Sequence, residues 1–159
     1  MNKAQLRTQI IARLRADLLV QTRAAALARD EATHEESRAE NKYDTRGQEA
    51  AYVAEGQARL AAEIDESIAL YTSLPLPAFA PDAPIAVGAG VEITDARGRV
   101  HAYFIGPRGG GMELEIDGRP LLVVTPASPL GRQLLGRRTG DAVVLPGRPP
   151  SPGRITAVE

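Results

Sequence analysis

Apolar residues, with an occasional polar one, recur at alternating steps of three and four along the first part of the chain. One stripe runs through Ile11, Leu14, Leu18, Gln21, Ala25 and Ala28, and a second through Ala50, Val53, Gln57, Leu60, Ile64, Ser67 and Tyr71. This heptad spacing is typical of helices that share a narrow apolar seam. Because neither helix can bury its stripe alone, residues 3–29 and 48–72 are predicted to form an antiparallel helical hairpin.

The register of this hairpin follows from the sizes of the side chains. If Gln21 faces Gln57, large residues meet near the base and small ones near the turn, in the pairs Leu18–Leu60, Leu14–Ile64, Ala25–Val53 and Ala28–Ala50. Two buried glutamine amides that face each other would satisfy one another's hydrogen bonds and fix this register.

The distribution of proline changes sharply at residue 74. Residues 3–73 contain none, whereas all twelve prolines lie beyond Leu74. The stretch LPLPAFAPDAP (74–84) is interpreted as a linker, because proline cannot continue a helix. The predicted domains are therefore an antiparallel helical arm at 1–73, a linker at 74–84 and a C-terminal domain at 85–159.

Residues 85–159 read as short alternating strands joined by turns. Turn signals occur at 95–98 and at Asp117–Gly118, and DAVVL and RITAV predict two further strands. Ser128 suits an N-cap, Pro129 the first helical position, and Leu130 an apolar helix face, so one short helix is expected here. The predicted fold class is α+β: an antiparallel helical hairpin followed by a small antiparallel sheet with one short helix.

Negative charge is concentrated at the predicted turn of the hairpin, within residues 30–47. Its acidic residues are Asp30, Glu31, Glu35, Glu36, Glu40 and Asp44. The net charge of the chain is only −1, which gives it no general attraction to nucleic acid or to a membrane surface. A run of this kind is often no more than a solvated turn, and the hairpin by itself would also suit a dimerisation element.

No complete catalytic site is recognisable in the sequence. The lack of cysteine excludes disulfides and cysteine-based zinc sites. His34 and His101 are interpreted as surface residues, and GPRGGG (106–111) as a flexible hairpin loop without a phosphate-binding lysine. Without a membrane span or a signal peptide, the expected location is cytoplasmic.

The segment SPLGRQLLGRRTGDAVVL (128–145) resembles the C-terminal signature of the Gre transcript-cleavage factors, bacterial proteins that bind RNA polymerase. The shared features are a Ser-Pro-hydrophobic start, a short helix ending in Leu-x-Gly, and a Gly-Asp pair that enters the final hairpin. ENKY (40–43) is similar to the acidic tip motif of that family. The resemblance extends over the arm, the linker and the C-terminal domain, which is nearly the whole chain.

This resemblance implies that residues 85–159 have an FKBP-like fold and bind RNA polymerase, with Ser128, Pro129 and Leu130 at the contact. The coiled coil would enter the secondary channel of the polymerase. Glu40 and Glu36 would then help to hold a catalytic Mg²⁺ of the polymerase, which hydrolyses backtracked RNA. The chain would be a monomeric accessory factor, not an enzyme, with no cofactor of its own, and would act on the nascent RNA 3′ end only indirectly.

The tip departs from the family pattern at one acidic position. The family has an Asp three residues before its Glu, where this chain has Ser37. Two alternatives therefore stay open: a regulator that occupies the channel without promoting cleavage, and a coiled-coil scaffold that dimerises through the arm.

Overall fold

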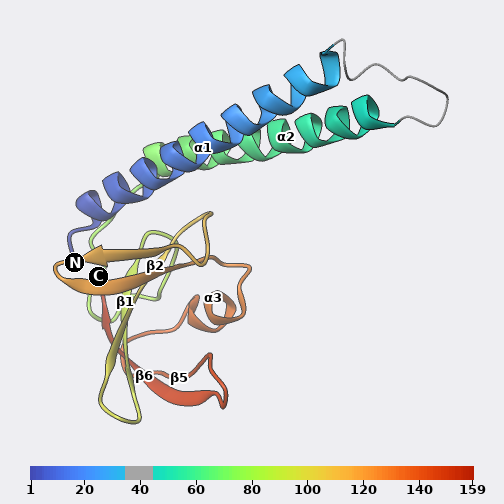
Figure 1. The fold of residues 1–159 in the computed structure, drawn as a ribbon. Helices are drawn as coiled ribbons and strands as arrows, with labels where there is room; N and C mark the ends of the chain where they lie inside the picture. Colours follow the sequence, from blue (N-terminus) through green and yellow to red (C-terminus); the bar gives the residue numbers. More distant parts are fainter. Residues whose placement is uncertain (35–44) are drawn as a thin grey trace. The chain divides into compact units, whose positions relative to one another are not determined.

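The computed structural model describes residues 1–34 and 45–159 (Figure 1). Its internal contacts divide the chain into two compact units. The helical unit is Ile11–Ala69, and the sheet unit combines Met1–Ile10 with Leu70–Glu159. Residues 74–84 form neither helix nor strand, as expected of a proline-rich segment.

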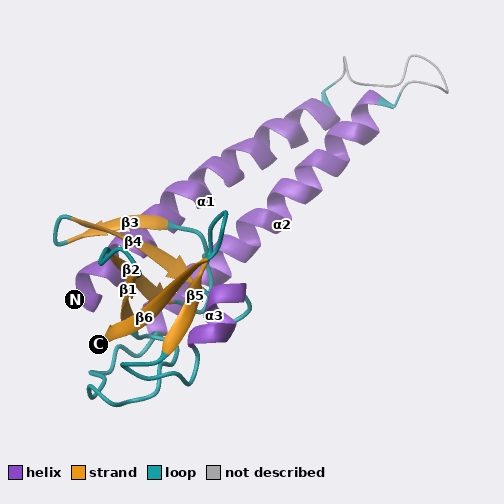
Figure 2. Ribbon diagram, turned by 90° about the horizontal axis from the view of Figure 1, so that it is seen from below, coloured by secondary structure: helices purple, strands orange, loops and turns teal. Residues whose placement is uncertain are grey.

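Two long helices, α1 (Lys3–Thr33) and α2 (Arg46–Ser73), lie antiparallel and side by side in both ribbon views (Figures 1 and 2). Both are longer than predicted. The Thr33 hydroxyl donates a hydrogen bond to the carbonyl of Arg29 at 3.0 Å, which supports the last turn of α1. The first turn of α2 is held by Thr45, whose hydroxyl donates to the Glu49 carboxylate at 3.0 Å and whose carbonyl accepts from the Glu49 amide at 2.9 Å.

The seam of the helical unit matches the prediction on α1 and departs from it on α2. Leu14, Ala25 and Ala28 are buried on α1 as expected. On α2, Val53 and Leu60 are 53% and 45% exposed, and Ala54 is buried in place of Val53. The predicted stripe on α2 therefore departs from the buried one at Val53 and Leu60. At this position the buried seam runs through Ala54, one residue beyond Val53.

The predicted hydrogen bonds between the two glutamine amides are not formed. The side-chain carbonyl oxygens of Gln21 and Gln57 are both buried, and neither accepts a hydrogen bond within the described chain. A hollow in the helical unit places Ala32 beside Ala51 and Ala54.

The sheet unit contains six strands and one short helix. The strands are β1 (Gly90–Asp95), β2 (Val100–Ile105), β3 (Glu113–Ile116), β4 (Arg119–Val124), β5 (Ala142–Leu145) and β6 (Ser151–Val158), and the helix is α3 (Pro129–Leu134). The spatial order is β3-β4-β2-β1-β6-β5. These elements confirm the predicted α+β class. At the β3–β4 turn, Asp117 and Gly118 have φ values of 53° and 72°, as the Asp-Gly signal requires.

One strand pair differs from the expected antiparallel sheet, because β2 and β4 are parallel. The reason lies in the apolar content of the β3–β4 hairpin. Leu121, Val123 and Val124 of β4 are buried, whereas only Ile116 of β3 is. After β2 the chain therefore forms β3 at the edge of the sheet, and the more apolar β4 then returns to lie between β3 and β2.

The core of the sheet unit lies where α3 packs against the strands. Ile93, Ile105, Leu134 and Ile155 are among its most buried members. Within the described ranges, neither of the long helices has the continuous apolar stretch that a membrane span needs.

Candidate functional site

The first candidate site is the start of α3, which carries the residues singled out in the sequence. Ser128 caps the helix as predicted: its Oγ accepts a hydrogen bond from the Gly131 amide at 3.0 Å and donates one to the Thr125 carbonyl at 2.8 Å. Pro129 occupies the first turn, where its missing amide proton is not needed. The loop therefore enters the helix in one defined conformation.

Gly131 holds this loop close to the helix, a role that sequence reasoning missed. A Cβ at this position would collide with the main-chain carbonyl of Thr125. The signal was present, because a glycine within a short helix is unfavourable unless another group approaches closely.

The far end of α3 is fixed by main-chain and side-chain hydrogen bonds. The Gly136 amide donates to the Ile85 carbonyl and the Ile85 amide donates to the Arg137 carbonyl, both at 2.8 Å. The side-chain amide of Gln133 pairs with the outer edge of β5: its Nε2 donates to the Val144 carbonyl at 3.2 Å and its Oε1 accepts from the Val144 amide at 3.0 Å.

The three predicted contact residues differ in what they present at the surface. Pro129 is exposed and Ser128 is half-buried. Leu130 is only 6% exposed and belongs to the core, so its side chain anchors α3 from inside. Arg132 and Arg137 are exposed on and just after the helix, and they add positive charge that the sequence reasoning did not weigh.

The second candidate site is the acidic segment between the long helices. Glu36 and Glu40 lie outside the described residues, as do Ser37, Glu35 and Asp44. On the described flanks, Asp30 and Glu31 are exposed at the end of α1. Within residues 1–34 and 45–159, no three histidine or acidic side chains gather in a way that could hold a metal ion.

A third polar centre was not foreseen and lies where β1 turns into β2. The carboxylate of Asp95 is 2% exposed. It accepts hydrogen bonds from the amides of Arg97 and Arg99 at 2.9 and 3.0 Å and from Arg99 Nε at 2.8 Å. His101 Nε2 lies 3.1 Å from the same carboxylate, so His101 is a partner of Asp95 and not an ordinary surface residue.

These hydrogen bonds set the charge state of Asp95. The bond with His101, followed by those from Arg99 and Arg97, holds the pKa of Asp95 well below its usual range, against the opposite effect of burial. The carboxylate is therefore ionised at neutral pH, and its hydrogen bonds go to the β1–β2 turn and to His101 of β2.

The glycine-rich loop 106–112 between β2 and β3 is bonded to its surroundings, for example by the Gly106 amide, which donates to the Val124 carbonyl at 2.9 Å. Tyr71, at the end of α2 and within the sheet unit, donates a hydrogen bond from its hydroxyl to the Arg108 carbonyl at 2.6 Å. Burial raises the pKa of this tyrosine well above its usual value. Gly106 has no room for a side chain, because a Cβ would meet the Tyr71 hydroxyl.

Comparisons with known proteins return solved structures only. No protein-family model matches the sequence, and no curated protein sequence matches it either. The chain is similar to a GreA factor homologue, Gfh1, of Thermus thermophilus, with 24% identity over 94% of each chain and a TM-score of 0.39. It is similar to Gfh1 of Thermus aquaticus, with 24% identity, 93% of this chain and 92% of the other covered, and a TM-score of 0.40.

A further similar structure is a prokaryotic transcription elongation factor, GreA/GreB, from Nitrosomonas europaea. The two sequences are 16% identical. The match covers 70% of this chain and 91% of the other, with a TM-score of 0.38.

Proposed function

We propose that this chain is a Gre-like transcription elongation factor that binds RNA polymerase and assists the cleavage of backtracked RNA. The sheet unit binds the polymerase through the surface at the start of α3, and the helical hairpin carries the acidic segment 30–47 into the secondary channel. This function implies a cytoplasmic location.

The observation that carries the proposal is that the residues of the Gre-like signature at 128–145 shape a single surface around α3. Each shared feature has a structural counterpart: Ser128 caps α3, Gly136 ends it with a φ of 77°, and Gly140 leads into β5 with a φ of 94°. The residues of the signature thus fix the backbone before and after α3, and Pro129 and Arg132 are exposed in its first turn.

The dimensions of the helices support the second half of the proposal. Helix α1 has 31 residues, which is roughly 45 Å at 1.5 Å per residue. A helix of this length, paired with α2, suits an acidic segment that acts within another protein's active site.

Glu36 and Glu40 are the acids proposed to act there. Mg²⁺ prefers carboxylate oxygens and supplies activation of water for attack on a phosphodiester. The contribution of this chain is to bring negative charge to the metal ion of the polymerase and to hold it there.

The direct test is a transcript-shortening assay on backtracked elongation complexes of RNA polymerase. Addition of the wild-type chain is expected to accelerate RNA shortening. Glu40→Ala should abolish the acceleration and leave polymerase binding unchanged, and Glu36→Ala should weaken it. Glu31→Ala is the matched control, because Glu31 is an exposed acid of the same segment at the end of α1. A wild-type chain that binds polymerase without shortening RNA would contradict the cleavage step.

Polymerase binding is tested separately at α3. Pro129→Ala and Arg132→Ala are expected to weaken binding, whereas Arg59→Ala, an exposed arginine of α2, serves as control for loss of one surface charge.

The second candidate function is a channel-binding regulator that does not promote cleavage. The observation that favours it is Ser37 at the position of the family's Asp. If this function holds, the wild-type chain competes with an active cleavage factor for the polymerase, and Ser37→Asp is expected to restore RNA shortening.

A further inference from the structure

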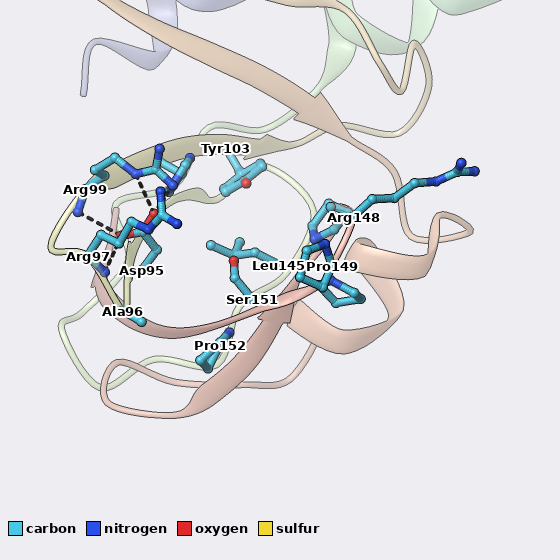
Figure 3. A pocket seen from close by; sticks show the side chains of 14 residues that line it. Asp95, Ala96, Arg97, Arg99, Tyr103, Leu145, Arg148, Pro149, Ser151 and Pro152 are labelled. Carbon is cyan, nitrogen blue, oxygen red and sulfur yellow. Dashed lines mark hydrogen bonds and ion pairs between the residues drawn. The ribbon is translucent and has the colours of Figure 1, made fainter.

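A pocket of about 380 Å³ lies within the sheet unit, apart from the surface of α3. One wall is the turn between β1 and β2, which contains Asp95, Arg97 and Arg99. The opposite wall is the proline-rich loop 146–150 between β5 and β6, with Ser151 and Pro152 at the start of β6 (Figure 3). A volume of this size falls in the range of roughly 300–1,000 Å³ that is usual for sites binding small molecules.

The charge of the lining is positive. Asp95 is its only acid, and that carboxylate already accepts three hydrogen bonds from Arg97 and Arg99. The guanidinium group of Arg97 forms no ion pair with the described residues, and the Arg99 side chain is 62% exposed although its Nε is bonded to Asp95. The guanidinium groups of Arg97 and Arg99 therefore have N–H donors left for a ligand. Asp95 offsets only one of their two positive charges.

Most of the remaining lining is apolar, with His101 and Ser151 as its other polar side chains apart from Arg148. Tyr103 and Leu145 are 6% and 3% exposed and form the floor between the arginines and the prolines (Figure 3). Pro149 of the loop and Pro152 of β6 belong to the opposite wall, where the fixed φ of proline restricts the backbone. The side chain of Arg148 extends away from the pocket (Figure 3), so the positive charge is confined to the β1–β2 side.

We propose that this pocket binds a phosphorylated small molecule. The phosphate group contacts Arg97 and Arg99, and the organic part packs on Leu145 and the proline-rich loop. A phosphate is favoured over a carboxylate because two guanidinium groups present more donors than a single carboxylate can accept. This site is independent of the polymerase-binding surface and does not rest on the proposed function.

Nuclear magnetic resonance titration of the ¹⁵N-labelled full chain tests the proposal, with ADP as the probe and with adenosine and inorganic pyrophosphate as the two comparison ligands. At low ionic strength, ADP is expected to give saturable shifts at the amides of 96–99 and 147–151. Adenosine should give none, and pyrophosphate should bind more weakly than ADP because it lacks the organic part. Added salt should weaken binding, as expected for an exposed charged pair.

Substitution separates this pocket from general attraction to positive charge. Arg97→Ala should weaken ADP binding roughly tenfold, as expected for loss of one charge-assisted contact. Arg132→Ala, an exposed arginine of α3 outside the pocket, should leave it unchanged. Arg97 is chosen because its side chain is not needed by Asp95, and an unchanged spectrum elsewhere verifies the fold.

Three results would overturn the proposal. They are the absence of saturable shifts at the pocket, equal binding of ADP by Arg97→Ala and the wild-type chain, and equal affinity for pyrophosphate and ADP.

Discussion

At the scale of single residues, Tyr71 joins the end of α2 to the loop between β2 and β3. Tyr71→Phe removes its hydrogen bond to the Arg108 carbonyl, and we expect the free energy of unfolding to fall by about 1 kcal/mol. Urea denaturation measures this change. Tyr52→Phe is the control, because Tyr52 is 65% exposed, and its effect should stay within about 0.5 kcal/mol.

Asp95 makes the stability of the sheet unit dependent on pH. Because its pKa is lowered on folding, the carboxylate contributes stability above about pH 4, the unfolded-state value, and loses it as the pH falls toward the folded-state pKa. Asp95→Asn should lower the melting temperature at neutral pH, and the difference from the wild type should shrink below about pH 4. A difference that stays constant across this range would show that the charge of Asp95 is not the source of its effect.

Two glycines should respond in opposite directions to the same substitution. Gly131→Ala places a Cβ against the Thr125 carbonyl and should lower the free energy of unfolding by about 1–3 kcal/mol, as overpacking does. Gly56→Ala on α2 meets no atom within 4 Å and should raise it by roughly 0.5–1 kcal/mol, because alanine favours a helix. Thermal denaturation monitored by circular dichroism compares the two variants directly.

At the scale of elements, the side chain of Gln133 occupies the outer edge of β5. Its amide makes the two hydrogen bonds that a neighbouring strand would make with Val144. Gln133→Ala should cost about 1–2 kcal/mol, since two hydrogen bonds are lost, and should leave an edge open to pairing between molecules. Light scattering at rising concentration detects that association, with Arg132→Ala on the same helix as control.

The positions of the elements were predictable because their signals are local. Heptad spacing marked both long helices, Asp117–Gly118 marked the β3–β4 turn, and Ser128 marked the start of α3. The parallel pairing of β2 with β4 was not, since it depends on which strand of the β3–β4 hairpin is more apolar in the finished sheet. The α2 seam was missed because Val53 and Ala54 are adjacent and both apolar, so the spacing alone did not decide between them.

Of the candidate sites, too, only the one with a local sequence signal was predictable. The cap formed by Ser128 follows from three consecutive residue types. The centre at Asp95 does not, because Arg99 and His101 reach it only after β1 and β2 have paired.

At the scale of the whole molecule, the unpaired carbonyl oxygens of Gln21 and Gln57 bear on self-association. If the arm dimerised through this seam, the second chain would be expected to supply hydrogen-bond partners for such buried groups. Both carbonyl oxygens are instead buried within one chain, in the seam between α1 and α2. We expect a monomer in sedimentation velocity at micromolar concentration. A dimer that persists on dilution, and that is lost on substitution of exposed residues such as Leu27 or Val53, would instead support the scaffold alternative.

The two hydrogen bonds between Ile85 and the segment Gly136–Arg137 have a mechanical consequence. Ile85 is the first residue after the linker 74–84, and its main chain is tied on both sides to the residues that close α3. Tension that reaches Ile85 along the chain is therefore passed to the end of that helix before it reaches the central strand β1, five residues further on. At this point of the chain, the segment that bears the Gre-like signature would carry mechanical load ahead of the sheet.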